Sequence, residues 1–186
     1  MTAVDLTPTS FVVLALVDLE GEATPYELKQ AAASRIGDFW SLVHSQFYAE
    51  PERLTRAGYL AERLEETGRR RKRYTLTEPG HRALRDWLAD PYTDPYELRD
   101  PGLLKLALGA DQRTLAAGQL ELHQRRLDRY EQIAAALPTQ AAAEGRVLAL
   151  QAGIGHEREY VRFWKALADA DNHAPPRSSS SRLAAS

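Results

Sequence analysis

The stretch YLAERLEETGRRRKRYTLT, residues 59–77, constrains the fold of this chain more than any other part of the sequence. Apolar and polar residues alternate on both sides of the pair Thr67-Gly68, with Leu60, Glu62 and Leu64 before it and Tyr74 and Leu76 after it. A period of two residues is typical of β-strands, and a glycine-containing turn between two such runs is typical of a hairpin. The stretch therefore predicts a two-stranded β-hairpin whose tip and second arm carry the basic run RRRKR.

Helix signals lie on both sides of this hairpin. Thr7 and Pro8 begin a first helix, which continues to Gly21, and Thr24 forms a capping box with Glu27 at the start of a second. The segment FWSLVHSQFYAEPERLTRAG, residues 39–58, predicts a third helix, which Gly58 ends. Pro51 predicts a bend or a tightened turn within it. Its expected core residues are Leu42, Val43, Phe47 and Leu54.

A fourth helix, EPGHRALRDWL, is capped by Thr77 directly after the hairpin. Three short helices, a hairpin and a closing helix follow one another in the order of a winged helix-turn-helix domain. The alternative is another small α+β domain with a charged loop. We predict the winged helix, because the capping signals and the hairpin signal are independent of each other.

The second half of the chain predicts two long helices. Apolar residues recur there at steps of three and four, which places each set on one stripe of a helix that needs a partner surface. Two helices alone bury little surface, so we expect the chain to dimerise through these stripes. The expected dimer residues are Leu120, Leu127, Tyr130, Leu150, Ile154, Val161 and Trp164.

Together these patterns predict a mainly α fold with one small β-hairpin. We expect a winged helix-turn-helix DNA-binding domain over residues 1–90 and a proline-rich linker over 91–101. A two-helix dimerisation domain over 102–170 and a disordered tail over 171–186 complete the prediction.

Composition excludes several classes of protein. None of the 186 residues is cysteine, which excludes disulfides, thiolate metal sites and cysteine nucleophiles. The N-terminus lacks a secretory signal, and the longest apolar run is too short to span a bilayer, so a cytoplasmic protein is expected. Enzymatic motifs are missing: HEREY at 156–160 has tyrosine where a zinc-protease helix needs its second histidine. We expect no catalytic residues, no metal and no cofactor.

Charge points to nucleic acid. The chain has 24 basic and 26 acidic residues in total, yet residues 53–73 contain eight basic residues and only three acidic ones. A run such as RRRKR is often only a solvated loop, but at the tip of a wing it suits DNA phosphates. The predicted third helix adds polar side chains that suit the major groove. The candidate DNA-binding residues are Ser41, His44, Ser45, Gln46, Tyr48, Arg69, Arg70, Arg71, Lys72 and Arg73.

Three segments resemble the PadR family of winged-helix transcriptional regulators: LTPTSFVVLALV, HSQFYAEPERLTRAGYL and RRRKRYTLTEPGHRAL. The family's serine-glutamine-apolar-tyrosine run of the recognition helix is matched by SQFY at 45–48. Its wing ending is matched by Tyr74, Leu76, Thr77 and Gly80. The segments PYELRDPGLLKLALG and HEREYVRFW resemble the helical C-terminal domain of the virulence-regulator-like subgroup. The resemblance spans about residues 6–168.

This resemblance implies a homodimeric regulator that binds double-stranded operator DNA. Since most members of the family repress transcription, it also implies a repressor, which a small aromatic or hydrophobic effector would release from the DNA. Candidate effector-lining residues are Trp40, Tyr130, Tyr160 and Trp164, with core or dimer packing as the alternative for each. Two features depart from the family pattern: Pro51 lies in the recognition helix, and the wing is unusually basic, which predicts high phosphate affinity. The rival interpretation is a winged-helix protein-interaction scaffold without specific DNA binding.

Overall fold

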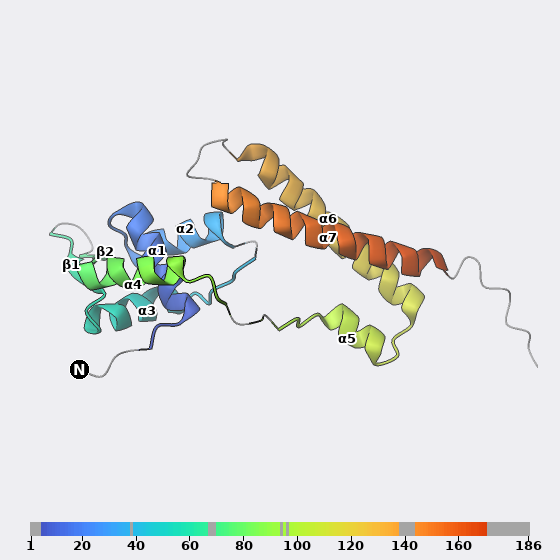
Figure 1. Cartoon of the computed structure of the whole chain (residues 1–186), viewed down its shortest axis with the longest axis horizontal. Coiled ribbons are helices and arrows are strands. Elements are labelled where there is room, and N and C mark those ends of the chain that lie inside the picture. The colour runs from blue at the N-terminus through green and yellow to red at the C-terminus, as the bar shows by residue number, and fades with distance from the viewer. Residues whose placement is uncertain are drawn as a thin grey trace, which may run out of the picture. The chain divides into compact units, whose positions relative to one another are not determined.

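The computed structural model describes residues 5–37, 39–66, 70–93, 95, 97–137 and 144–170. In this part of the chain there are seven helices and one two-stranded sheet (Figure 1). The chain divides into two compact units, one ending at Tyr96 and the other beginning at Glu97. This boundary lies within the linker that the sequence predicts.

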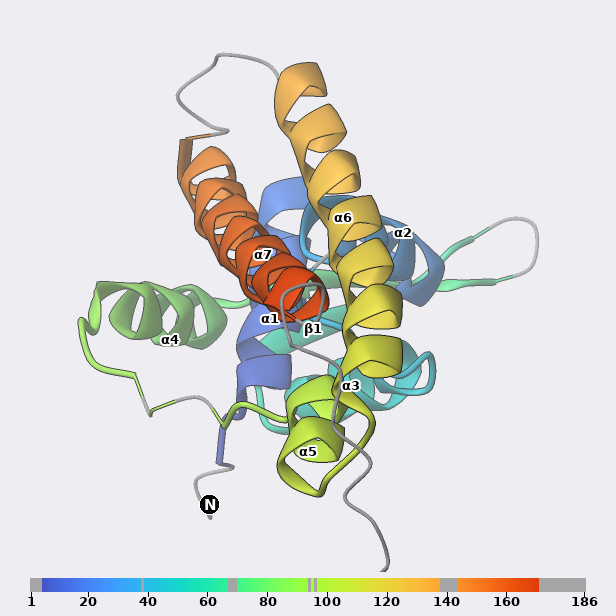
Figure 2. The ribbon, with the colours of Figure 1, turned by 90° about the vertical axis from the view of Figure 1, so that its right-hand side faces the viewer.

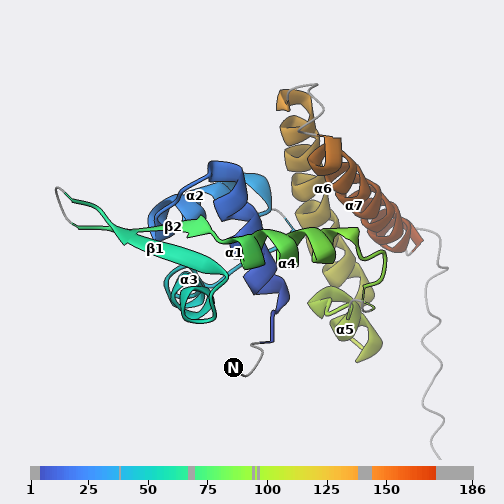
Figure 3. The same cartoon turned by 60° about the vertical axis from the view of Figure 1, so that its left-hand side comes forward.

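The first unit is a winged helix-turn-helix domain, as predicted. Its elements are α1 (Pro8–Glu20), α2 (Pro25–Arg35), α3 (Gln46–Arg56), β1 (Leu60–Leu64), β2 (Lys72–Leu76) and α4 (Glu78–Ala89). The strands pair antiparallel with Leu60 opposite Leu76. Figures 2 and 3 show the hairpin extending beyond α2 and α3. Backbone hydrogen bonds between Ala23 and Tyr74 tie β2 to the segment that precedes α2.

Local sequence signals explain most of these boundaries. Thr7 caps α1 with Pro8 as its first residue, and Gly21 ends the helix with a φ of 72°. Thr24 and Glu27 form the predicted reciprocal cap of α2, in which Thr24 N–H donates to Glu27 Oε2 at 2.8 Å. The prediction for these two helices is confirmed to within one residue.

The predicted third helix is too long. Residues 39–45 lie outside α3, where Phe39, Trp40 and Val43 are exposed, and Val43 is therefore not the core residue that we expected. A helix is held in a protein mainly by burying one apolar face, and in this segment only Leu42, half-buried, packs against the core as predicted. Pro51 lies inside α3 and is buried, and Gly58 follows the helix with a φ of 83°.

The core of the first unit gathers side chains from all four helices and both strands. Its buried members are Val13, Leu14, Leu16, Val17, Ala23, Leu28, Ala32, Phe47, Leu54, Leu60, Tyr74 and Leu84. On the fourth helix, Trp87 stacks on Phe11 of α1 with ring centroids 4.6 Å apart, whereas Leu88 is exposed. This core fixes α3 and the hairpin on the same small scaffold.

The second unit contains one helix more than predicted: α5 (Pro101–Ala107), α6 (Gln112–Ala136) and α7 (Glu144–Ala170). Asp100 caps α5 by accepting hydrogen bonds from the backbone N–H groups of Gly102 and Leu103. Sequence reasoning missed this Asp-Pro helix start because it assigned the prolines to a linker. Helices α6 and α7 run antiparallel and side by side (Figures 1 and 2).

Candidate nucleic-acid interface

The turn that leads into α3 exposes most of the predicted DNA-reading residues. Ser41, His44, Ser45 and Tyr48 are all exposed, and the rings of His44 and Tyr48 lie 5.3 Å apart. Only Tyr48 belongs to the helix itself, since Ser45 is its N-cap residue. These side chains therefore form a polar surface at the helix N-terminus, where hydroxyl and imidazole groups can meet base edges or phosphates.

Gln46 is placed differently from the other candidates. Its side chain is half-buried, and its Oε1 accepts a hydrogen bond from the backbone N–H of Val43 at 2.9 Å. A bidentate contact with adenine needs both the oxygen and the nitrogen of this amide. The bond to Val43 occupies one of the two lone pairs of Oε1 and orients the amide, so the base contact predicted from the sequence must use the second lone pair together with Nε2.

The hairpin is less basic than its sequence implies, because most of its cations are paired with carboxylates. Arg71 Nε lies 3.0 Å from Glu65 Oε2, and Arg73 Nε lies 3.1 Å from Glu65 Oε1. Lys72 Nζ lies 2.8 Å from Glu52 Oε1 and 3.2 Å from Glu62 Oε2. The expectation of high phosphate affinity did not take these ion pairs into account. One of their carboxylates, that of Glu52, comes from α3.

Two further pairs extend this pattern to the start of α2. Arg63 NH2 lies 3.0 Å from Glu22 Oε1, and Arg73 also approaches Glu27 at 3.5 Å. The pairing shifts the carboxylates: the hydrogen bond from Arg71 lowers the pKa of Glu65, and the hydrogen bond from Lys72 lowers the pKa of Glu52. Both carboxylates are thus firmly ionised at neutral pH.

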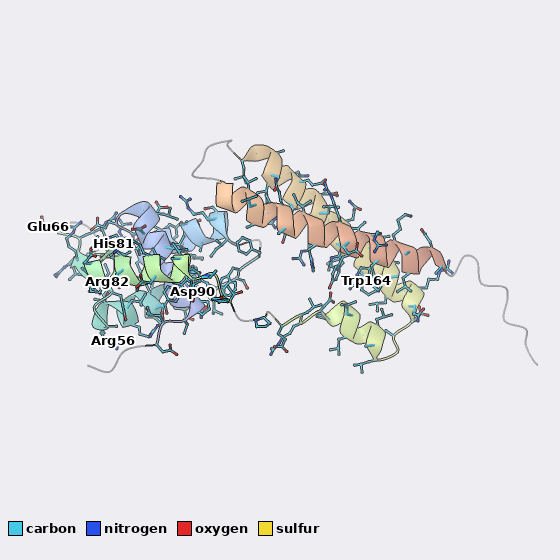
Figure 4. All side chains as sticks on the ribbon, viewed as in Figure 1. Arg56, Glu66, His81, Arg82, Asp90 and Trp164 are labelled. Atoms are coloured by element: carbon cyan, nitrogen blue, oxygen red, sulfur yellow. The ribbon has the colours of Figure 1, made fainter. Side chains whose placement is uncertain are left out.

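Two cations on α3 and the hairpin have no ion pair within the described part of the chain. Arg70 is exposed at the start of the second arm with a φ of 48°, and Arg56 is exposed in the last turn of α3 (Figure 4). Arg56 was not among the predicted DNA-binding residues, although it belongs to the basic stretch that the sequence shows. The predicted contact Arg69 lies outside the described residues.

The predicted effector residues are divided between the two units. Trp40 is exposed in the segment before α3, whereas Tyr130, Tyr160 and Trp164 lie on α6 and α7. Tyr130 and Trp164 are buried, and the ring of Tyr160 packs on His123 and His156 at 4.6 and 4.4 Å. The structure thus brings no more than three of them into one unit, and their role in effector binding stays a prediction.

The predicted dimer stripes face each other within one chain. Leu127, Tyr130, Leu150 and Ile154 form a single buried cluster, against which Val161 packs. Leu120 is half-buried, and Trp164 on α7 is fully buried (Figure 4). Since α6 and α7 cover these side chains for each other, the packing offers no support for their contact with a second protomer. Their role in dimerisation stays a prediction.

A buried polar group on the same helices was missed as a site. His123 Nδ1 and Glu157 Oε2 are 2.6 Å apart with side chains 5% and 1% exposed, and Arg126 Nε reaches Glu157 Oε1 at 3.3 Å. The sequence contained the signal, since both residues occupy positions in the two apolar stripes. A buried polar pair at one level of two facing stripes fixes the register of the helices.

The described residues contain neither a metal-binding cluster nor a membrane-spanning helix. In this part of the chain no three or more His, Cys, Asp or Glu side chains are grouped so as to hold a metal ion. Nor is any of the described helices both long and apolar enough to cross a membrane.

Comparison with known proteins agrees with the site geometry. Residues 13–86 match the transcriptional regulator PadR-like family, and residues 98–170 match the virulence activator alpha C-terminal family. The negative transcriptional regulator PadR of Bacillus subtilis (strain 168) is 28% identical over 162 residues, which cover 80% of this chain and 89% of the relative. These are regulators of transcription and not enzymes.

Two solved structures of the Bacillus subtilis protein are similar to this chain. PadR in complex with operator DNA has a TM-score of 0.76 and 26% identity, covering 89% of this chain and 99% of that one. PadR in complex with p-coumaric acid has a TM-score of 0.71 and 24% identity, covering 91% and 100%. The two family matches follow one another along the chain, and these relatives span both. The chain is therefore a member of the PadR-like family of transcriptional regulators, with a C-terminal domain of the virulence activator type.

Proposed function

We propose that this regulator binds a specific double-stranded operator through the turn before α3 and through the hairpin. The observation that carries the proposal is the similarity to PadR in complex with operator DNA, which spans both units at 26% identity. The first unit supports it, because exposed His44, Ser45 and Tyr48 stand at the N-terminus of α3. A helix of this kind fits the major groove, which is about 12 Å wide.

We further propose that the regulator acts as a dimeric repressor. The Bacillus subtilis relative is named a negative regulator, and a two-fold dimer would read two half-sites about 34–36 Å apart or a multiple of that distance. The second unit would supply the dimer contact. Its exposed apolar residues are Leu98, Leu104, Leu108, Leu122, Leu148 and Phe163.

Release by a small aromatic or hydrophobic effector is the third part of the proposal. It is supported by the complex of the Bacillus subtilis relative with p-coumaric acid and by the aromatic side chains on α6 and α7. Adding p-coumaric acid to a preformed complex with DNA tests it. A fall in anisotropy that Tyr160→Ala abolishes would support the effector step, whereas an unchanged signal excludes this phenolic acid as effector.

Fluorescence anisotropy tests the proposed DNA binding itself. The protein is titrated against a labelled duplex from the region upstream of its own gene and against a scrambled duplex, both at about 0.15 M salt. We expect affinity at least ~1,000-fold higher for the upstream duplex, in the range of specific regulators. Equal affinity for the two duplexes contradicts specific recognition of this site. Absence of binding to either favours the scaffold interpretation, which the extensive pairing of the wing cations makes the natural rival.

A further inference from the structure

Lys72 on the second strand of the hairpin sits between two carboxylates. Its Nζ lies 2.8 Å from Glu52 Oε1 of α3 and 3.2 Å from Glu62 Oε2 of β1. One positive and two negative charges leave this triad with a net negative charge. An approaching DNA phosphate therefore meets repulsion at a position where the sequence alone predicts attraction.

The contact between Glu52 and Lys72 is solvent-exposed. The Lys72 side chain is 40% exposed and that of Glu52 is 51% exposed, so the pair contributes little to folding. Both groups instead lie on the surface that includes α3 and the hairpin, the two elements assigned to DNA. The position of the pair thus bears on binding more than on stability.

We propose that Glu52 is a specificity-determining residue that limits affinity for non-operator DNA by neutralising Lys72. The inference rests on the proposed function. Non-specific binding is almost entirely electrostatic, and a non-specific complex has no fixed register, so any free cation can reach a phosphate. In the operator complex, base contacts fix a single register, and a freed Lys72 gains less there. Glu52 thereby widens the difference between operator and other DNA.

The charge-removing variant Glu52→Gln tests this inference on the scrambled duplex. Without Glu52, Lys72 keeps only the longer contact with Glu62 at 3.2 Å, and the triad changes from a net negative charge to a neutral pair. Lys72 can then exchange Glu62 for a DNA phosphate, and one added phosphate contact steepens the slope of log K against log salt by roughly 0.9. At about 0.1 M salt this corresponds to roughly 5- to 10-fold tighter binding of scrambled DNA. The affinity for the operator should rise less, so the specificity ratio falls. Thermal melting should be unchanged, which verifies that the variant is folded.

Glu66→Gln is the matched control. Glu66 is an exposed carboxylate at the end of the first hairpin arm, just after β1 (Figure 4), and among the described residues it has no ion pair. Its substitution removes the same charge and should change scrambled-duplex affinity by less than about twofold, because it frees no cation. Lys72→Gln alone should not strengthen binding of the scrambled duplex, since it leaves the carboxylates of Glu52 and Glu62 without their cation.

A double-mutant cycle shows whether Glu52 acts through Lys72. In the Lys72→Gln background, Glu52→Gln should have no effect on scrambled-duplex affinity. An effect that persists there, an equal effect of Glu66→Gln, or a loss of operator affinity alone overturns the inference. If the wild type binds DNA without sequence preference, the proposed function fails and with it the effect of Glu52 on specificity. The limit that Glu52 sets on non-specific affinity is still tested, because the cycle is measured on scrambled DNA. If neither the wild type nor Glu52→Gln binds any duplex, both fail.

Discussion

Gly80, the last residue of the motif that ends the wing, is required there for a steric reason. It lies in the first turn of α4, where a Cβ would stand 2.2 Å from the carbonyl oxygen of Tyr59. Thr77 Oγ1 accepts a hydrogen bond from Gly80 N–H and lies within 3.0 Å of the Tyr59 carbonyl. The glycine thus lets α4 begin directly against the strand, and the wing ending of the PadR family has a steric reason here.

We expect Gly80→Ala to lower the stability of the first unit by about 1–3 kcal/mol, because the backbone of Tyr59 or of α4 must move. Thermal denaturation followed by circular dichroism measures this loss. Gly118→Ala is the control, since Gly118 lies in α6 with nothing within 4 Å of the added Cβ. That substitution should leave stability equal or raise it by about 0.5–1 kcal/mol. Equal effects of the two variants would refute the steric explanation.

The stability of the first unit should depend on pH through the carboxyl group of Glu27. The hydrogen bond from Thr24 backbone N–H, reinforced by the positive charge of Arg73, lowers the pKa of this carboxyl from its ordinary value of 4.5. A carboxyl whose pKa is lowered on folding contributes stability that is present above its unfolded-state pKa and is lost as pH falls through its folded-state pKa. The capping box should therefore weaken below a pH of 4.5.

The variant Glu27→Gln isolates this contribution, because glutamine can still accept the Thr24 hydrogen bond but does not titrate. We expect its melting temperature to fall less than that of the wild type between about pH 6 and about pH 3. Melting curves at several pH values provide the comparison. Parallel pH profiles for the two proteins would mean that Glu27 keeps its ordinary pKa in the folded state.

Local signals of this kind were readable from the sequence, whereas contacts between distant residues were not. The caps of Thr7, Thr24 and Thr77 depend on neighbours three residues away and were predicted correctly. The pair of Lys72 with Glu52 joins residues twenty positions apart, and no local pattern announces it. For the same reason the charge of the wing was read correctly from composition, but its neutralisation was not.

At the scale of elements, the second unit is held together by the stripes that we first assigned to a dimer. Periodicity placed their residues on one face of each helix correctly, but it could not say whether that face meets the same chain or another. Leu127 and Ile154 pack in one buried cluster within the chain, where α6 and α7 lie antiparallel. For the proposed dimer, exposed apolar residues are therefore the candidates that we test first.

We predict that Leu122→Asp together with Leu148→Asp converts the proposed dimer to a monomer. Both leucines are exposed in the single chain, at 39% and 58%, and a charge buried in a protein interface costs several kcal/mol. Size-exclusion chromatography with light scattering gives the mass, and circular dichroism verifies that helix content is retained. Leu127→Asp should instead reduce helix content, because Leu127 is buried within the chain. A double variant that stays dimeric would place the interface elsewhere.

At the scale of the whole molecule, most of the described cations in residues 53–73 are paired with carboxylates. The salt dependence of binding should therefore be shallower than eight basic residues in 53–73 suggest. We predict that Arg70→Gln lowers the slope of log K against log salt by roughly 0.9, because it removes an unpaired cation. Arg71→Gln should lower it much less, since Arg71 is paired with Glu65. Equal slopes for the two variants would mean that breaking the ion pair between Arg71 and Glu65 on DNA binding costs no free energy.

The central claim is that the turn before α3 and the hairpin together form the DNA-contact surface. Hydrogen exchange with and without the upstream duplex, followed by mass spectrometry, tests it most directly. Hydrogen exchange in residues 43–50 and 72–76 should slow on addition of the upstream duplex, and the scrambled duplex at the same salt should cause no such change. Protection confined to α6 and α7, with 43–50 and 72–76 unchanged, would contradict it.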